Sequence, residues 1–134
     1  MTIPLILLVV HFLADFPLQW NWMSLGKSKN TLKGLGALTS HVLVYSLCFL
    51  FWGLPFAAVT FATHWLTDFV TSRITSTLFP FVPAWPEFEK PPYIEWYNKD
   101  GEGWRSNHWF FVCIGADQLI HTVTLALTYK WLFL

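Results

Sequence analysis

Three histidine/aspartate pairs lie inside long apolar stretches of this 134-residue chain, with the two residues of each pair four positions apart. The pairs are His11/Asp15, His64/Asp68 and Asp117/His121. Four residues are about one helical turn, so each pair projects from one face of its helix. A carboxylate near the centre of a membrane costs about 2.5 to 3.5 kcal/mol on insertion scales, so three of them require cations, partners or enclosed water. We therefore expect function at these polar residues.

The composition predicts a membrane protein. The chain is 54% hydrophobic and only 12% charged, which is too apolar for an ordinary soluble domain. Its formal net charge is zero, so no global basic field favours nucleic acid, and we expect no nucleic-acid partner. The two cysteines, Cys48 and Cys113, lie in apolar segments without CxxC spacing, which favours neither a disulfide framework nor a zinc knuckle.

The hydropathy pattern predicts an all-α, integral membrane four-helix bundle that forms a single domain over residues 1–134. The predicted spans are residues 3–23, 35–52, 56–77 and 108–134. The short connection at residues 53–55 makes the second and third spans an antiparallel hairpin. Residues 79–107 are rich in proline and tryptophan, so we expect an interfacial loop between helices 3 and 4.

The charges of the loops predict an orientation. The loop after the first span contains Lys27, Lys29 and Lys33 and no acidic residue, whereas the connection at residues 53–55 is uncharged. Because cytoplasmic loops are enriched in basic residues, we expect the lysine loop in the cytoplasm and both termini outside.

Counted inward from the predicted cytoplasmic ends, the polar residues of all four spans fall at similar depths, and they predict one shared layer. The candidate metal ligands are His11, Asp15, His41, His64, Asp68, Asp117 and His121. Inward-facing carboxylates and imidazoles of a four-helix bundle are a known way to build a two-metal site. Seven ligands exceed the needs of one tetrahedral zinc and suffice for two ions about 3.5 to 4 Å apart. Gln19 and Gln118 suit second-shell orientation of the ligands or contact with substrate.

The same histidine and aspartate residues could instead serve only to pack the helices together. A lone intramembrane histidine such as His41 is more often a hydrogen-bonded packing residue than a ligand. One histidine/aspartate pair could likewise be a neutralised contact between helices. Three such pairs at compatible depths are an expensive way to hold helices together, which favours the metal site.

Several motifs resemble a known family. The sequence HFLADFPLQ at residues 11–19, followed by Trp22, Met23 and Lys27, resembles the start of the membrane proteins grouped as domain of unknown function 3307. His41, HWLTD at residues 64–68 and DQLIH at residues 117–121 follow in that family's order, so the resemblance covers nearly the whole chain. It implies a small multi-pass protein of bacteria or phage, and hence the bacterial inner membrane.

The chain is also distantly similar to membrane-bound metal-dependent hydrolases that have histidine and aspartate residues scattered over their helices. Where we would expect a lysine shortly after Asp68, Arg73 stands instead and could supply the charge.

The leading functional hypothesis is a metal-dependent hydrolase of a phosphoester in a phospholipid or lipid-linked substrate. Zinc is the first choice of metal, with manganese or iron as alternatives, in one or two ions. His41 would be a further ligand or a general base, and Arg73 or Lys27 would hold the substrate phosphate.

Two other classes remain open. Chains of intramembrane aspartate and histidine also serve proton or metal-ion relays, although four short spans would then require a homo-oligomer. A non-enzymatic membrane partner with a structural metal is the third hypothesis.

Overall fold

We describe the fold from a computed structural model of residues 4–78 and 103–134, with side chains for 4–78 and 111–134. The elements in chain order are α1 (Leu5–Asp15), α2 (Asn21–Gly26), α3 (Leu32–Leu47), the short 3-10 helix η1 (Leu50–Trp52), α4 (Leu54–Leu78) and α5 (Gly103–Phe133). These ranges contain no strand, so the all-α prediction is confirmed. The predicted loop lies outside the described residues up to position 102, and α5 begins at Gly103, before the predicted start of the last span.

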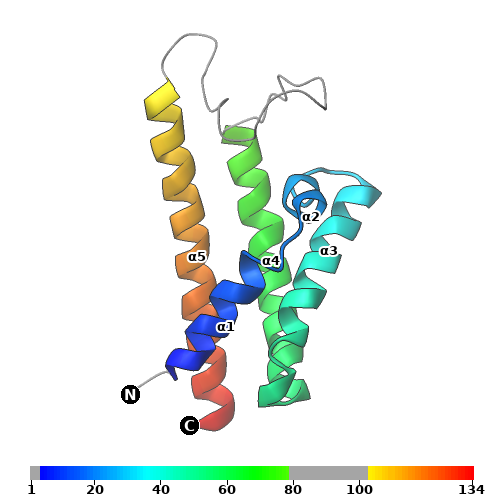
Figure 1. The fold of residues 1–134 in the computed structure, drawn as a ribbon, viewed down its shortest axis with the longest axis vertical. Coiled ribbons are helices and arrows are strands. Elements are labelled where there is room, and N and C mark those ends of the chain that lie inside the picture. Colours follow the sequence, from blue (N-terminus) through cyan, green and yellow to red (C-terminus); the bar gives the residue numbers. More distant parts are fainter. Residues whose placement is uncertain (1–3, 79–102) are drawn as a thin grey trace.

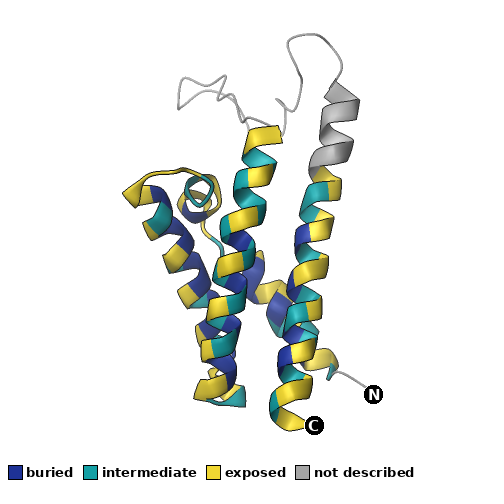
Figure 2. Ribbon diagram, turned by 180° about the vertical axis from the view of Figure 1, so that it is seen from behind, coloured by how far each residue is buried: buried dark blue, intermediate teal, exposed yellow. Residues whose placement is uncertain are grey.

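The helices α3, α4 and α5 overlap the last three predicted spans, and α1 lies within the first. Figure 1 shows α4 and α5 side by side along the length of the molecule, with α3 against α4 and α2 against α3. The helix α1 lies obliquely across the others and contacts α3, and both termini are at the end of the molecule opposite α2. Figure 2 shows that buried residues gather on the faces that the helices turn toward one another.

The first predicted span, residues 3–23, does not form one continuous helix. It is divided into α1, a turn over residues 16–20, and the beginning of α2. Pro17 explains the break, because proline lacks a backbone N–H and disfavours helical geometry at the residue before it. With 11 residues, α1 rises roughly 16 Å, about half of a bilayer's hydrocarbon core.

The second helix of the bundle begins earlier than predicted, because the sequence provides a cap. Thr31 is the N-cap of α3, and its hydroxyl accepts a hydrogen bond from the Gly34 N–H at 3.0 Å. The helix α3 ends at Leu47, and η1 leads to Gly53, whose φ of 101° suits glycine. Pro55 then lies in the first turn of α4, where proline is well tolerated.

The apolar core lies at the η1 end of the molecule. Its buried residues are Leu7, Ala14, Tyr45, Phe49, Phe56 and Leu125. Large apolar side chains also cover the outside: Phe51 is 92% exposed and Trp131 is 74% exposed. Such an apolar exterior is typical of a surface that contacts lipid or another protein.

The membrane prediction is only partly supported. In the described part of the chain, residues Phe111–Phe133 of α5 are the one helical stretch long and apolar enough to cross a membrane, judged by length and composition. The helix α1 is apolar but short, and α4 contains threonine, histidine and aspartate along its length. The multi-pass arrangement therefore remains a proposal.

Candidate metal centre

The candidate site lies where the end of α1 meets the middle of α3, α4 and α5. Each helix contributes at least one buried acidic or imidazole side chain, and none of them exposes more than 8% of its surface. These residues are His11 and Asp15 from α1, His41 from α3, His64 and Asp68 from α4, and Asp117 and His121 from α5. Four helices therefore bring the seven predicted ligands into one buried region.

The spacing of four residues places two of the three pairs in direct contact. His64 Nε2 is 3.7 Å from Asp68 Oδ2, and His121 Nε2 is 3.3 Å from Asp117 Oδ1. The third pair differs, because the Nδ1 atom of His11 shares a hydrogen bond of 2.8 Å with the hydroxyl of Tyr45. His11 is thus held at the edge of the cluster.

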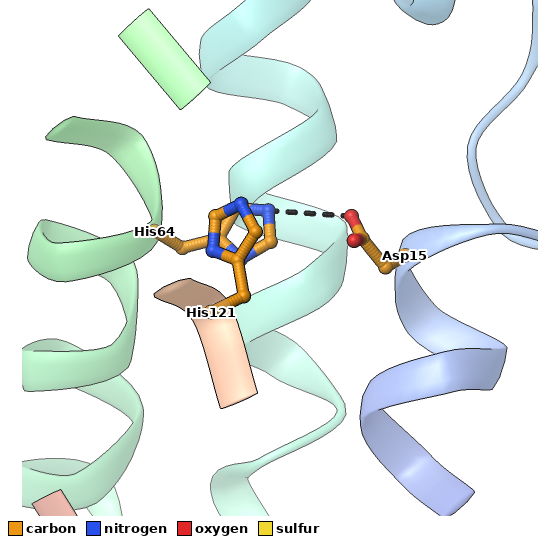
Figure 3. A group of neighbouring side chains, drawn as sticks. All are labelled: Asp15, His64 and His121. Carbon is orange, nitrogen blue, oxygen red and sulfur yellow. Dashed lines mark ion pairs between the residues drawn. The ribbon is translucent and has the colours of Figure 1, made fainter. Parts of the chain in front are cut away.

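Contacts between helices connect the pairs. His41 Nε2 lies 3.0 Å from Asp15 Oδ1, and His64 Nε2 lies 3.4 Å from the same oxygen. His121 Nε2 lies 3.2 Å from Asp68 Oδ1. Figure 3 shows the side chains of Asp15, His64 and His121 pointing toward one another from α1, α4 and α5. One aspartate oxygen therefore faces imidazoles from two other helices.

The imidazole nitrogens also converge on each other. His41 Nε2 is 3.2 Å from His64 Nε2, and the rings of His64 and His121 stack with centroids 3.9 Å apart. The Nδ1 atoms of these three histidines are buried without a hydrogen-bond partner among the described residues. Each ring therefore directs Nε2 into the cluster, and two nitrogens at this distance require a shared proton or cation.

Among the residues that the structure describes, three groups have ligand atoms within 4.8 Å of one another and could hold a metal ion. They are Asp15/His64/His121, His41/His64/Asp68 and Asp68/Asp117/His121. Imidazole nitrogens with carboxylate oxygens suit zinc, and manganese and iron accept the same donors, so the donor set fits a divalent transition metal. His11 belongs to none of the three groups, unlike the other six predicted ligands.

Lys27 reaches this cluster from the end of α2. Its Nζ donates to Asp68 Oδ2 at 2.9 Å, and its side chain is 17% exposed. Burial alone would lower the pKa of the Lys27 ammonium, but the carboxylates of Asp68 and Asp15 raise it above the ordinary lysine value. Lys27 is therefore a charged side chain that connects the buried carboxylates with the molecular surface.

Arg73 lies close by but makes other contacts. Its Nε donates to Asn30 Oδ1 at 2.8 Å, its Nη1 donates to the Phe69 carbonyl at 2.9 Å, and its guanidinium lies 3.8 Å above the Phe69 ring. A longer contact of 3.5 Å joins Nη1 to the Lys27 carbonyl. Arg73 thus holds the backbone around Lys27 and, within the described part of the chain, makes no hydrogen bond or ion pair with a carboxylate.

The two predicted glutamines behave differently. Gln118 Nε2 donates to Asp15 Oδ2 and lies 3.3 Å from Asp117 Oδ2, so it connects two carboxylates of the cluster. Gln19 follows α1, and its side-chain nitrogen is buried with no hydrogen-bond partner among the described residues. The structure therefore brings Gln118 to the cluster and shows no hydrogen bond from the Gln19 side-chain nitrogen to it.

Two further residues contact the cluster that the sequence did not indicate as site residues. Thr71 Oγ1 donates to Asp117 Oδ1 across the α4–α5 contact, and Tyr45 packs its ring 3.8 Å from that of His64. Thr71 follows Asp68 by three positions and Tyr45 follows His41 by four, so each shares a helix face with a predicted ligand. That spacing was the available signal, but threonine and tyrosine are ordinary in apolar helices.

The chain belongs to the family described as "Protein of unknown function (DUF3307)", whose model matches residues 3–134. No curated protein and no solved structure shows significant similarity to it. The expected similarity to metal-dependent hydrolases thus has no named homologue behind it.

Proposed function

We propose that this protein is a membrane-embedded, metal-dependent hydrolase that cleaves a phosphoester in a lipid or lipid-linked substrate. The observation that supports this proposal is the overlap of the three ligand groups, since His64, Asp68 and His121 each belong to two of them. Shared or adjacent ligands are typical of two-ion centres, in which ions about 3.5 to 4 Å apart stabilise the attacking and leaving oxygens of phosphoryl transfer.

The chemistry divides between the metal and the protein. A bound divalent metal would supply an acidified water and polarise the phosphoryl oxygens. In the net reaction, the water oxygen bonds to phosphorus, the ester oxygen leaves as an alcohol, and the proton of the water passes to it. The closeness of His41 Nε2 to His64 Nε2, at 3.2 Å, favours a ligand over a general base at His41, because a shared cation satisfies both nitrogens.

Substrate binding is assigned to Lys27. Its ammonium lies at the partly exposed side of the cluster, where it would meet a phosphate group that approaches the metals. Arg73, the other predicted phosphate ligand, directs Nε to Asn30 Oδ1 and Nη1 to the Phe69 carbonyl. We therefore assign Arg73 the role of holding Lys27 in place.

The proposal is tested by phosphate release from phosphatidic acid and from a lipid-linked monophosphate in mixed micelles. We expect turnover that requires added zinc, manganese or iron and stops with a chelator. Asp117→Asn should lower turnover by at least about a hundredfold, since loss of a second-shell partner alone costs roughly 10- to 100-fold. Glu95→Gln, a matched change outside the predicted ligands, should be neutral. Turnover that survives both the chelator and Asp117→Asn would contradict the proposal.

The broken first helix favours an ion relay as the second candidate. Asp15 is the last residue of α1, and discontinuous helices in transporters place such C-terminal ends against cations. Metal uptake or proton flux in proteoliposomes, without hydrolysis of either lipid, would favour this relay. Tightly held metal with neither turnover nor flux would favour the third hypothesis, a structural metal in a membrane partner.

A further inference from the structure

Lys27 occupies a position that matters for the number of metal ions. Its Nζ is 2.9 Å from Asp68 Oδ2, the oxygen that also faces His41 Nε2 at 3.4 Å and His64 Nε2 at 3.7 Å. An ammonium donates hydrogen bonds but cannot bind a metal, and it repels a nearby cation. The group His41/His64/Asp68 is therefore closed to a metal while Lys27 stays on Asp68.

Another ligand group remains open. Asp15, His64 and His121 form a group that does not include Asp68. An ion in this group would not compete with the ammonium for a shared oxygen. The arrangement therefore favours one ion in the cluster while Lys27 is in place.

The balance of charges in the cluster also favours a single divalent ion. Three buried carboxylates and the Lys27 ammonium leave two negative charges when the metal-bound imidazoles are neutral. One divalent ion balances these charges. A second ion would leave two uncompensated positive charges in a buried site, which is unfavourable unless an anion enters as well.

We propose that Lys27 is a resident cation that closes the His41/His64/Asp68 group, and that a second divalent ion enters only together with a phosphate anion that draws the ammonium away from Asp68. This inference rests on the metal site of the proposed function. The partly exposed Lys27 side chain gives the ammonium room to turn toward an anion at the surface. The anion also supplies the negative charge that the second ion requires.

The test counts bound Mn²⁺ by equilibrium dialysis of the detergent-purified protein, with and without inorganic phosphate. We expect one equivalent without phosphate and two with it. Lys27→Met should bind the second equivalent without phosphate, at least about tenfold more tightly than the unchanged protein, because a unit positive charge is removed. Lys27→Arg retains the charge and should bind one equivalent. Lys33→Met, which removes an exposed lysine, should match the unchanged protein.

The outcomes separate this inference from the proposed function. Two equivalents without phosphate in the unchanged protein would overturn the inference and leave the metal site intact. One equivalent in every sample, with phosphate and with Lys27→Met included, would also overturn it and leave a single-metal site. No bound metal under any condition would contradict both the inference and the proposed function.

Discussion

His11 and Tyr45 contact each other beside the three ligand groups. The Tyr45 hydroxyl is 2.8 Å from His11 Nδ1, and the Tyr45 ring packs 3.8 Å from His64. Both side chains are buried, Tyr45 to 1% exposure and His11 to 5%. His11 therefore fixes Tyr45, and Tyr45 fixes the ring of a residue that belongs to two ligand groups.

Because His64 and His11 differ in this way, we expect their alanine variants to differ in metal binding. His64→Ala should abolish metal binding, because His64 belongs to two of the three groups. His11→Ala should keep the stoichiometry and weaken metal affinity by about tenfold, which is the lower end of the loss seen when a residue that orients a metal ligand is removed. Metal titration of the two variants checks this expectation. If His11→Ala loses its metal as completely as His64→Ala, His11 is itself a ligand.

The contacts of the paired residues show what a sequence can predict. The spacing of four residues correctly placed His64 beside Asp68 and Asp117 beside His121, because helical geometry alone decides it. His11 lies in none of the three ligand groups, and its Nδ1 atom instead shares a hydrogen bond with Tyr45 from another helix, which the spacing did not indicate. Contacts between helices depend on packing that a single sequence does not contain.

The connection between α2 and α3 is the element that positions Lys27. A Cβ on Gly34 would collide with the Lys29 carbonyl oxygen, and a Cβ on Gly26 would lie 2.8 Å from the Ala37 Cβ. Glycine at both positions therefore allows α2 and the following loop to pack closely on α3. This close packing brings the end of α2 within reach of Asp68.

A matched pair of glycine variants tests this role. Gly34→Ala should displace the loop, weaken the Lys27–Asp68 contact and cost about 1 to 3 kcal/mol of stability, as overpacking usually does. Gly36→Ala, on the same helix with nothing within 4 Å of its Cβ, should be neutral or slightly stabilising. Thermal unfolding in detergent measures both variants. Equal melting temperatures would contradict the close approach at Gly34.

Hydropathy, with the glycine and proline residues between the helices, predicted α3, α4 and α5. It did not predict the break in the first span, because the residues on both sides of Pro17 are apolar. Hydropathy measures whether a segment prefers lipid, whereas the end of a helix depends on one backbone N–H. The break nevertheless matters for the site, since it places Asp15 at a helix end.

The whole molecule combines an apolar exterior with a polar interior layer. Large apolar side chains face outward along the helices, while carboxylates and imidazoles are enclosed between them. The lysine loop and η1 lie at opposite ends of α3, whose 16 residues rise roughly 24 Å (Figure 1). If the molecule spans a membrane along α3, the lysine loop and η1 would therefore lie on opposite sides of that membrane.

Cysteine labelling tests that orientation. In a background without Cys48 and Cys113, Leu54→Cys should react with an impermeant maleimide on intact cells, because Leu54 is 71% exposed and lies in the connection at residues 53–55, at the end predicted to lie outside. Lys33→Cys should react only after the cells are permeabilised, since the lysine loop is predicted to be cytoplasmic. Labelling of both positions from one side would contradict the multi-pass arrangement.

Both the proposed hydrolase activity and the role of Lys27 require that the buried cluster binds metal. The decisive measurement is elemental analysis by plasma mass spectrometry of the protein purified in mild detergent, repeated after chelation and reloading. We expect one equivalent of a divalent transition metal in phosphate-free buffer, lost with the chelator and restored on reloading. A protein that holds no metal after purification, and takes up none from excess zinc, manganese or iron, would contradict both proposals.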